Sequence, residues 1–301
     1  SGFCLMVEGI CLAGITETPV VVVLGQRPGP AVGLPTRTSQ EELEFAIHVG
    51  SGEFPRAVLA PATIEEHFWL TVKAFNLAEK YQIPVILLTD HHIATSYATV
   101  LPFDLSKVTI DRGNLFPDKT GGRSEEYKRH RLTVSGISPR AFPGQSPALV
   151  VTDSDEHDEA GHLIEDAVTR SAQVEKRMRK MSGLKQEIAP PQLYGPETAE
   201  ITLIGWGGTR GAIHEAVDIL QGEDTGVNAI HLAEIWPFPA EEMAKALGNT
   251  RQSYVIDNNA TGQLSHLIQA ETGHKVTGRI LKYDGRPFTP AYIVEKVQKG
   301  V

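Results

Sequence analysis

The chain has 301 residues, of which 41% are hydrophobic and 22% are charged, a composition typical of folded globular proteins and a length that allows two domains. The formal net charge of -9 argues against a surface that binds nucleic acid or an anionic membrane. No apolar run approaches the roughly 20 residues that a membrane-spanning helix needs. We therefore expect the chain to bind neither nucleic acid nor a membrane.

The two cysteines, Cys4 and Cys11, bear on cofactors and on the redox compartment. If residues 3–16 form a helix, seven steps of about 1.5 Å place the two roughly 10 Å apart, which is too far for a disulfide. An iron–sulfur cluster takes about four cysteines. We therefore expect a reduced, cytoplasmic chain, with any iron–sulfur cluster held by a partner.

The chain opens directly on this apolar helix, without an initiator methionine or a charged leader. A doubly wound layer normally supplies a strand before its first helix. The sequence thus predicts a fragment that lacks the amino-terminal part of its first domain.

Residues 20–24 read VVVVL and lead into a loop at 25–36 that is rich in glycine and proline and carries Arg27. The absence of alternation predicts a central strand with both faces buried. Open parallel sheets bind ligands beyond the carboxyl ends of their strands, where a stiff loop can present a guanidinium to a carboxylate or phosphate. A simple surface ion pair of Arg27 is the alternative that the loop alone leaves open.

Helices and strands alternate after this loop. Two patterns, Ser39 with Glu42 and Thr63 with Glu66, are typical of capping boxes at helix starts. Together with the first strand, the elements predict a βαβαβ layer with right-handed crossovers. The expected elements are helices at 43–48 and 64–81 and strands at 56–60 and 85–90.

Periodicity is lost from about 99 to 156, and so long a stretch is typical of a segment that contacts a partner or covers a site. Its basic residues alternate with acids, which favours a solvated face. These basic residues are Arg123, Lys128, Arg129, His130 and Arg131.

The acidic segment at 153–167 contains His157 and His162, which raises metal ligation as a possibility. Because the spacing fixes no ligand geometry, we do not predict a metal site there. The helix that follows, at 167–181, is expected to bury one side. That side carries Val168, Val174 and Met178.

A proline-rich stretch at 188–198 predicts a linker, beyond which the α/β pattern starts again. The turn GWGGTR at 205–210 is similar to a dinucleotide fingerprint, but Arg210 stands where the third glycine belongs. A tight strand-to-helix turn is therefore favoured over a dinucleotide dehydrogenase. The expected elements are strands at 201–208, 228–234, 251–258 and 278–281, with helices that start at 209, 240, 263 and 290.

Taken together and in chain order, several segments resemble the alpha subunit of 2-oxoacid:ferredoxin oxidoreductases, with the 2-oxoglutarate-type enzymes as the closest fit. They run from residue 1 to the end of the chain, and the arginine loop is the most specific of them. The segments are GFCLMVEGICLAG, QRPGPAVGLPTRT, GEFPRAVLAP, AFNLAEKYQIPVILLTD, DEHDEAGH, IGWGGTRGAI, DNNATGQL and KYDGRPFTP.

This resemblance implies an α/β protein of two doubly wound, mostly parallel-sheet domains. Residues 1–187 are similar to a truncated thiamine-diphosphate pyrimidine-binding domain, residues 188–198 form the linker, and residues 199–301 are similar to the transketolase C-terminal domain. The implied enzyme oxidatively decarboxylates a 2-oxoacid with coenzyme A, giving an acyl-CoA, CO2 and reduced ferredoxin.

The resemblance also implies cofactors and partners. Thiamine diphosphate and Mg2+ are held by, or shared with, a separate beta subunit, which also carries the iron–sulfur cluster. The implied partners are this beta subunit, ferredoxin, the 2-oxoacid and coenzyme A, in a hetero-oligomer or a homodimer of the fragment. We expect no metal site in this chain.

Site residues follow from the resemblance position by position. Arg27 matches the family arginine that holds the substrate carboxylate, and Thr36 matches a threonine nearby in the substrate pocket. Val32 stands where oxoglutarate-type members commonly carry threonine, which predicts a less polar substrate. The positions implied to contact the cofactor are Ser1, Gly2, Phe3, Gly33 and Pro35.

The family glutamate that protonates the cofactor's pyrimidine belongs upstream of the turn at residues 1–3. The resemblance therefore implies no catalytic residue in this chain, and Glu8 and Glu17 are not substitutes because they lie on or past the following helix. We expect the isolated polypeptide to be inactive. A non-catalytic binding or assembly module derived from this family is the alternative.

Overall fold

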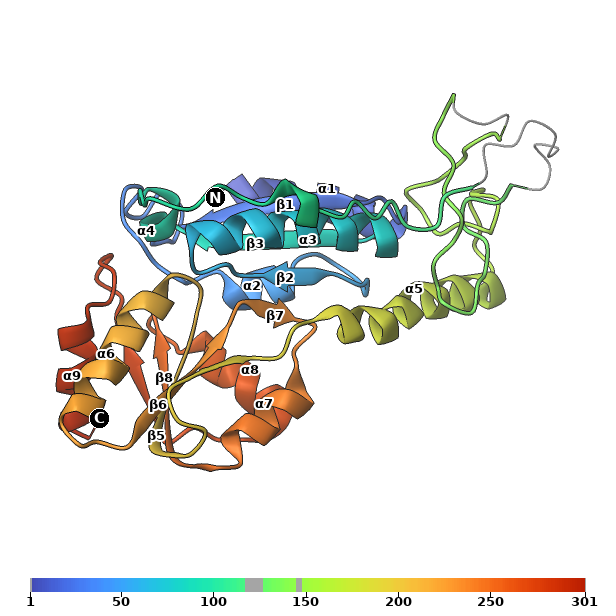
Figure 1. Ribbon diagram of the computed structural model, residues 1–301. Coiled ribbons are helices and arrows are strands. Elements are labelled where there is room, and N and C mark those ends of the chain that lie inside the picture. Colours follow the sequence, from blue (N-terminus) through green and yellow to red (C-terminus); the bar gives the residue numbers. More distant parts are fainter. Residues whose placement is uncertain (1, 117–126, 145–147, 301) are drawn as a thin grey trace.

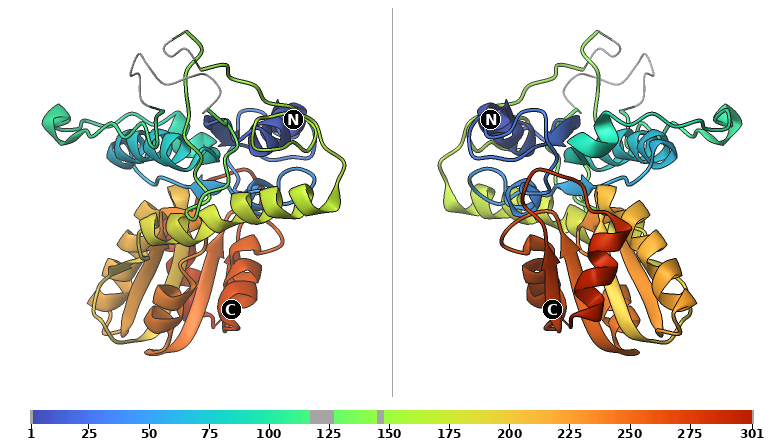
Figure 2. Two further views of the ribbon diagram at one scale, coloured as in Figure 1. Left: turned by 90° about the vertical axis from the view of Figure 1, so that its right-hand side faces the viewer. Right: turned by 90° about the vertical axis from the view of Figure 1, so that its left-hand side faces the viewer.

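The computed structural model describes residues 2–116, 127–144 and 148–300. Two sheets, each flanked by helices, lie one above the other, and the long helix α5 connects them (Figure 1). The two turned views show α5 running across the junction between the domains (Figure 2). This arrangement confirms the predicted α/β class with two mostly parallel sheets.

The first sheet has the strand order β1-β3-β2-β7. Strands β1 (Val20–Gln26), β3 (Pro84–Asp90) and β2 (Ala57–Leu59) are parallel. The fourth strand, β7 (Glu234–Trp236), comes from the second half of the chain and pairs antiparallel with β2. The sequence did not predict this pairing, which joins the two halves of the chain through backbone hydrogen bonds.

The prediction that the valine strand is buried on both faces was wrong for β1. All seven residues of β3 are buried, but Val23 on β1 is 62% exposed. The reason is position: among the described residues, β1 pairs with β3 alone and therefore forms the edge of the sheet. A run of valines indicates burial, but it does not distinguish a central strand from an edge strand.

The helices of the first domain cover the sheet and hold its loops. Thr63 caps α3 as predicted, because its hydroxyl accepts a hydrogen bond from the Glu66 N–H at 3.1 Å. Ser39 does not cap α2, whose N-cap residue is Glu42. The helices are α1 (Gly2–Ile15), α2 (Leu43–Ile47), α3 (Ile64–Tyr81), α4 (His91–Ala94) and the 3-10 turn η1 (Leu105–Lys107).

Helix α5 (Ala167–Glu187) buries a different face from the predicted one. Val168 is 81% exposed and Met178 is 37% exposed, whereas Lys176 and Lys180 are almost completely buried. The helix packs against polar partners, a buried carboxylate and backbone carbonyls, which accept hydrogen bonds from these long cationic side chains. An apolar stripe was therefore a poor guide to its orientation.

The second sheet has the order β4-β6-β5-β8-β9, in which β4 alone is antiparallel. Most elements lie where the sequence placed them, but β4 falls within the stretch expected to be a linker. The strands are β4 (Gln192–Tyr194), β5 (Ala199–Trp206), β6 (Val227–Leu232), β8 (Thr250–Asp257) and β9 (Gly278–Leu281). The helices are η3 (Gly207–Thr209), α6 (Arg210–Gly222), α7 (Ala240–Leu247), α8 (Gln263–Thr272) and α9 (Pro290–Gln298).

One hydrophobic core spans both domains. It includes Phe3 and Leu88 from the first domain and Trp206 and Leu264 from the second. Because these side chains belong to one cluster, the carboxyl ends of the second sheet are fixed against the first domain. None of the helices within the described residues is long and apolar enough to cross a membrane.

Candidate functional site

The arginine loop begins where β1 ends and closes on itself. The Leu34 N–H donates to the Pro28 carbonyl at 3.1 Å, and the Arg37 N–H donates to the Leu34 carbonyl at 3.1 Å. Gly33 lies at φ +52, and a Cβ there would be 1.8 Å from the Pro28 oxygen. This close approach requires glycine, so the sequence fixes the shape of the loop.

Arg27 lies on a pocket of about 690 Å³. Its side chain is half-buried, and within the described parts of the chain its guanidinium makes no hydrogen bond or ion pair. The pocket is lined by the first turns of α1, the end of β1, the start of the loop and the start of α2. The lining residues are Gly2, Phe3, Cys4, Leu5, Met6, Val23, Leu24, Gly25, Arg27, Gly29, Pro30, Ala31, Glu42 and Phe45.

The pocket brings together some of the predicted site residues and leaves others apart. Gly2 and Phe3 share it with Arg27, and the Phe3 ring packs edge-to-face on Phe45 with centroids 5.0 Å apart. The other predicted loop positions are exposed and do not line it. These positions are Val32, Gly33, Pro35 and Thr36. Ser1 lies outside the described residues, as does Arg123 of the basic patch.

Glu42 is a site residue that the sequence did not reveal. Its Oε2 is buried without a hydrogen-bond partner among the described residues. Burial, together with the charge of Glu41, raises the pKa of Glu42 to about 7, although Arg27 acts to lower it. The pocket therefore carries a cation and a carboxyl that titrates near neutrality. The only sequence signal was the pair Glu41-Glu42, which follows the loop that carries Arg27.

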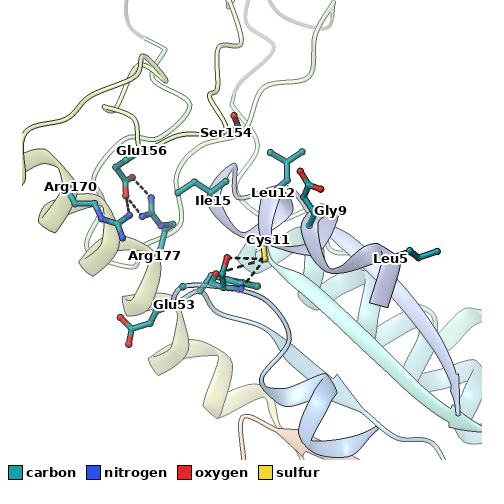
Figure 3. A pocket seen from close by; sticks show the side chains of 14 residues that line it. Leu5, Gly9, Cys11, Leu12, Ile15, Glu53, Ser154, Glu156, Arg170 and Arg177 are labelled. Carbon is teal, nitrogen blue, oxygen red and sulfur yellow. Dashed lines mark hydrogen bonds and ion pairs between the residues drawn. The ribbon is translucent and has the colours of Figure 1, made fainter. Parts of the chain in front are cut away.

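A second pocket, of about 710 Å³, lies between α1, the turn near Glu53 and α5 (Figure 3). Its two arginines, Arg170 and Arg177, both point to Glu156, and Arg177 bonds that carboxylate at 2.7 and 2.8 Å. Because the carboxylate already occupies these guanidinium groups, they are poorly placed to bind an anionic substrate. The smaller pocket at Arg27 is thus the better candidate site.

The histidines of the acidic segment do not come together. His157 is buried and stacks obliquely on His130, with ring centroids 3.8 Å apart, whereas His162 is exposed and pairs with Asp158. Within the described parts of the chain, no group of three or more His, Cys, Asp or Glu side chains is placed to hold a metal ion.

A buried cluster of charges, which we call the Glu17 cluster, lies behind α1. The Glu17 carboxylate contacts Lys176 at 2.5 Å, Lys180 at 2.6 Å and His130 at 3.0 Å. Arg129 donates to the carbonyl of the same residue at 2.5 Å. These contacts fasten α5 and the residues around His130 to the end of α1. The cluster is a structural device, since it does not line the Arg27 pocket.

Comparisons with known proteins cover the whole chain. The 2-oxoacid:ferredoxin oxidoreductase 1, subunit alpha, of Sulfurisphaera tokodaii is 40% identical over 306 residues, covering 100% of this chain and 47% of that protein. The 2-oxoglutarate synthase subunit KorA of Methanothermobacter marburgensis is 29% identical, covering 98% of this chain and 77% of that protein.

A solved structure agrees with these relatives. The 2-oxoglutarate:ferredoxin oxidoreductase from Magnetococcus marinus, with 2-oxoglutarate, coenzyme A and succinyl-CoA bound, matches with a TM-score of 0.91 and 35% identity. The match covers 99% of this chain and 51% of that chain. This chain thus spans about half the length of the first of these relatives and of the solved structure.

Two family models match successive parts of the chain. Residues 199–293 match the pyruvate:ferredoxin oxidoreductase core domain II. Residues 1–176, more than half of the chain, match the family described as pyruvate flavodoxin/ferredoxin oxidoreductase, thiamine diphosphate-binding. With the two-sheet fold and the arginine loop already established, the chain belongs to the thiamine diphosphate-binding family of pyruvate flavodoxin/ferredoxin oxidoreductases.

Proposed function

We propose that this chain is part of the alpha subunit of a 2-oxoacid:ferredoxin oxidoreductase and that Arg27 holds the substrate carboxylate. The observation that carries the proposal is the half-buried Arg27 guanidinium, which has no partner among the described residues, on a pocket at the carboxyl end of β1. A guanidinium fork binds a carboxylate through two parallel hydrogen bonds, which orients the bond that breaks in decarboxylation.

The same pocket fits the organic part of thiamine diphosphate. Phe3, Leu24 and Phe45 supply an apolar wall for a flat ring, and Glu42 offers a buried carboxyl oxygen with no hydrogen-bond partner in the described parts of the chain. The chemistry that this cofactor supplies is a carbon nucleophile and an electron sink for decarboxylation. The residues of this chain position the ring and the 2-oxoacid and keep the pocket largely apolar.

The loop beyond the pocket is proposed to set substrate preference. Thr36 and Val32 are both exposed and stand close to Arg27 in sequence. A valine in place of a hydroxyl-bearing residue favours a 2-oxoacid with a less polar tail. Val32→Thr is therefore expected to raise kcat/KM for 2-oxoglutarate relative to pyruvate, and Gly33 and Pro35 are proposed to keep the loop against the cofactor.

Partners complete the proposed enzyme. We propose that a beta subunit holds the diphosphate, Mg2+ and an iron–sulfur cluster, that coenzyme A accepts the acyl group and that a ferredoxin accepts the electrons in the cytoplasm. This proposal is supported by the names of the relatives, which are alpha subunits of ferredoxin-linked enzymes, and by the ligands named for the Magnetococcus marinus enzyme.

A second candidate is a non-catalytic assembly module. The observation in its favour is the outer face of α1, where Leu5 is 89%, Met6 49% and Leu12 47% exposed. A helix that is apolar on all sides is normally covered, so this face is suited to docking. The module hypothesis predicts that the chain binds a partner subunit but that Arg27 makes no difference to turnover.

The test is Arg27→Gln in the assembled holoenzyme, measured as KM and kcat for the 2-oxoacid. We expect KM to rise at least about tenfold, corresponding to about 1.5–3 kcal/mol for a hydrogen bond to a charged group. Arg37→Gln is the matched control, because Arg37 lies next to the same loop but outside the pocket, and its guanidinium bonds the neighbouring Thr36 carbonyl. Equal constants for Arg27→Gln and the native enzyme would remove Arg27 from the site.

A further inference from the structure

Gln40 lies between the arginine loop and the start of α2 and is only 1% exposed. Each of its hydrogen-bonding groups is bonded to the second domain. Its backbone N–H donates to the Asn258 carbonyl at 2.9 Å, and its side-chain oxygen accepts from the Asn258 N–H at 3.2 Å. Its side-chain amide donates to the Trp206 carbonyl at 2.8 Å, and its carbonyl accepts from the Asn259 side chain at 2.8 Å.

These partners lie at the ends of two strands of the second sheet. Trp206 is the last residue of β5, and Asn258 and Asn259 directly follow β8. The Asn259 side-chain oxygen also accepts from the N–H groups of Thr261 and Gly262, at the start of α8. Gln40 is therefore held where the carboxyl ends of two strands lead into the next elements.

The residues beside Gln40 add further hydrogen bonds between the domains, and we call this row of bonds the seam. The Thr38 N–H donates to the Gly285 carbonyl at 3.4 Å, and its hydroxyl donates to the Asp90 carboxylate at 3.2 Å. That carboxylate also accepts from the Gly208 N–H of the second domain at 3.0 Å. On the other side of Gln40, the Gln263 amide donates to the Glu41 carbonyl at 2.7 Å.

The seam reaches Arg27 through short steps. Gln26, the residue before Arg27, accepts from the Glu42 N–H at 3.2 Å. Gly29, two residues after Arg27, donates its N–H to the Glu41 carboxylate at 2.8 Å. The chain on both sides of Arg27 is thus bonded to the two residues that follow Gln40.

We propose that Gln40 is a positioning residue through which the second domain fixes the placement of Arg27 over its pocket. The proposal rests on the proposed function, in which Arg27 binds the substrate carboxylate. A displacement of about 1 Å in a group that orients the substrate is enough to lower the reaction rate strongly. The second domain therefore contributes to substrate capture without contacting the substrate.

The test compares two substitutions to methionine in the assembled holoenzyme. Gln40→Met keeps the side-chain length but removes the two side-chain hydrogen bonds, to Trp206 and Asn258, while the backbone bonds remain. Lys73→Met is the matched control, because Lys73 also links the domains, through Glu234 at 2.7 Å, but does not contact the loop. We expect Gln40→Met to raise KM for the 2-oxoacid about fivefold or more, with KM for coenzyme A unchanged, and Lys73→Met to leave both constants unchanged.

A double-mutant cycle shows whether Gln40 acts through Arg27. Once Arg27→Gln is present, we expect Gln40→Met to add little further increase in KM, because the group that it positions is gone. Fully additive effects, or an equal rise in KM for Lys73→Met, would overturn the proposal. If Gln40→Met fails to fold, Gln40→Glu takes its place, since it keeps the acceptor for Asn258 and loses the donor to Trp206.

Hydrogen exchange separates this inference from the proposed function. In the full-length chain, Gln40→Met is expected to speed exchange of the Leu34, Arg37 and Glu42 amides, which close the loop, whereas Lys73→Met is not. If Arg27→Gln itself leaves KM unchanged, the proposed function fails. Faster exchange in Gln40→Met still supports the conclusion that Gln40 holds the loop in place. Unchanged exchange in Gln40→Met contradicts the positioning role whatever the kinetics.

Discussion

The Lys180 ammonium lies 2.6 Å from the Glu17 carboxylate, and both side chains are 1% exposed. Lys176 approaches the same carboxylate from one turn earlier on α5. One buried anion therefore pairs with more than one buried cation. Removing a single member of such a group leaves uncompensated charge in a medium of low polarity, which is strongly destabilising.

Glu17→Gln is expected to lower the free energy of unfolding by about 3–5 kcal/mol, because Lys176 and Lys180 lose their counter-ion. Urea unfolding of the two proteins measures this difference, and Glu8→Gln on the exposed side of α1 is the control. Burial raises the pKa of Glu17, but Lys180, His130 and Lys176 outweigh it and hold the pKa well below its ordinary value. The stabilisation is thus present above about pH 4.5 and is lost as the pH falls. A change within about 0.5 kcal/mol would contradict the role of the cluster.

His231 on β6 should make the protein sensitive to acid. Its ring nitrogens are buried without hydrogen-bond partners among the described residues, and burial, with Arg210 and His214, lowers its pKa to about 3. Between about pH 6.5 and 3 the unfolded chain binds a proton that the folded protein does not, so stability falls as the pH falls. We expect a loss of up to about 1.4 kcal/mol per pH unit from this group.

The check is His231→Leu, compared with the native protein by urea unfolding at pH 7 and pH 5. The variant should lose less stability on acidification, whatever its stability at pH 7. Equal losses in the two proteins would show that His231 does not contribute to the acid response.

Glu42→Gln should change the pH dependence in the opposite sense. Because the pKa of Glu42 is raised to about 7, the folded protein holds more protons than the unfolded chain between about pH 4.5 and 7, and stability falls as the pH rises through that window. Glu42→Gln is expected to lack this fall in stability, because the glutamine side chain does not titrate. Unfolding at pH 5 and pH 8 measures it, and parallel pH profiles for the two proteins would refute the raised pKa.

The same substitution tests competition within the pocket. Ionised Glu42 competes with the substrate carboxylate for Arg27, so KM for the 2-oxoacid in the native holoenzyme should rise above about pH 7. In Glu42→Gln the rise should be absent. A rise of equal size in both enzymes would place Glu42 outside the interaction between Arg27 and the substrate.

Gly33→Ala should distort the loop. The new Cβ meets the Pro28 carbonyl, and the backbone lies in the left-handed region at φ +52. We expect a loss of about 1–3 kcal/mol in stability together with a higher KM for the 2-oxoacid. Gly211→Ala on α6, where a Cβ meets nothing within 4 Å, is the control. Native-like kinetics in Gly33→Ala would show that the loop tolerates another conformation.

The sequence allowed prediction of what local patterns encode. Continuous apolar runs, helical spacing and capping patterns located most strands and helices, including β9 at its observed bounds, and the glycine-proline loop led to Arg27. What it could not reveal depends on partners far along the chain. His130 was predicted to lie on a solvated face, but it is buried against Glu17, 113 residues earlier in the chain, and β7 is only three residues long.

The site shows the same division. Arg27 was found because its loop has an unusual local composition, whereas Glu42 and Gln40 look like ordinary polar residues at a helix start. What sets them apart is the burial of one carboxyl oxygen and the contact of one amide with the Trp206 carbonyl, 166 residues later. No periodicity or spacing records such long-range contacts.

The antiparallel pairing of β7 with β2 has a consequence for biosynthesis. While the chain emerges from the ribosome, β2 keeps an open edge until Trp236 has been made, and open edges invite pairing with other chains. We therefore expect the two domains to mature together, after Trp236 has been made, and chaperones that bind exposed strands to engage this protein before that point.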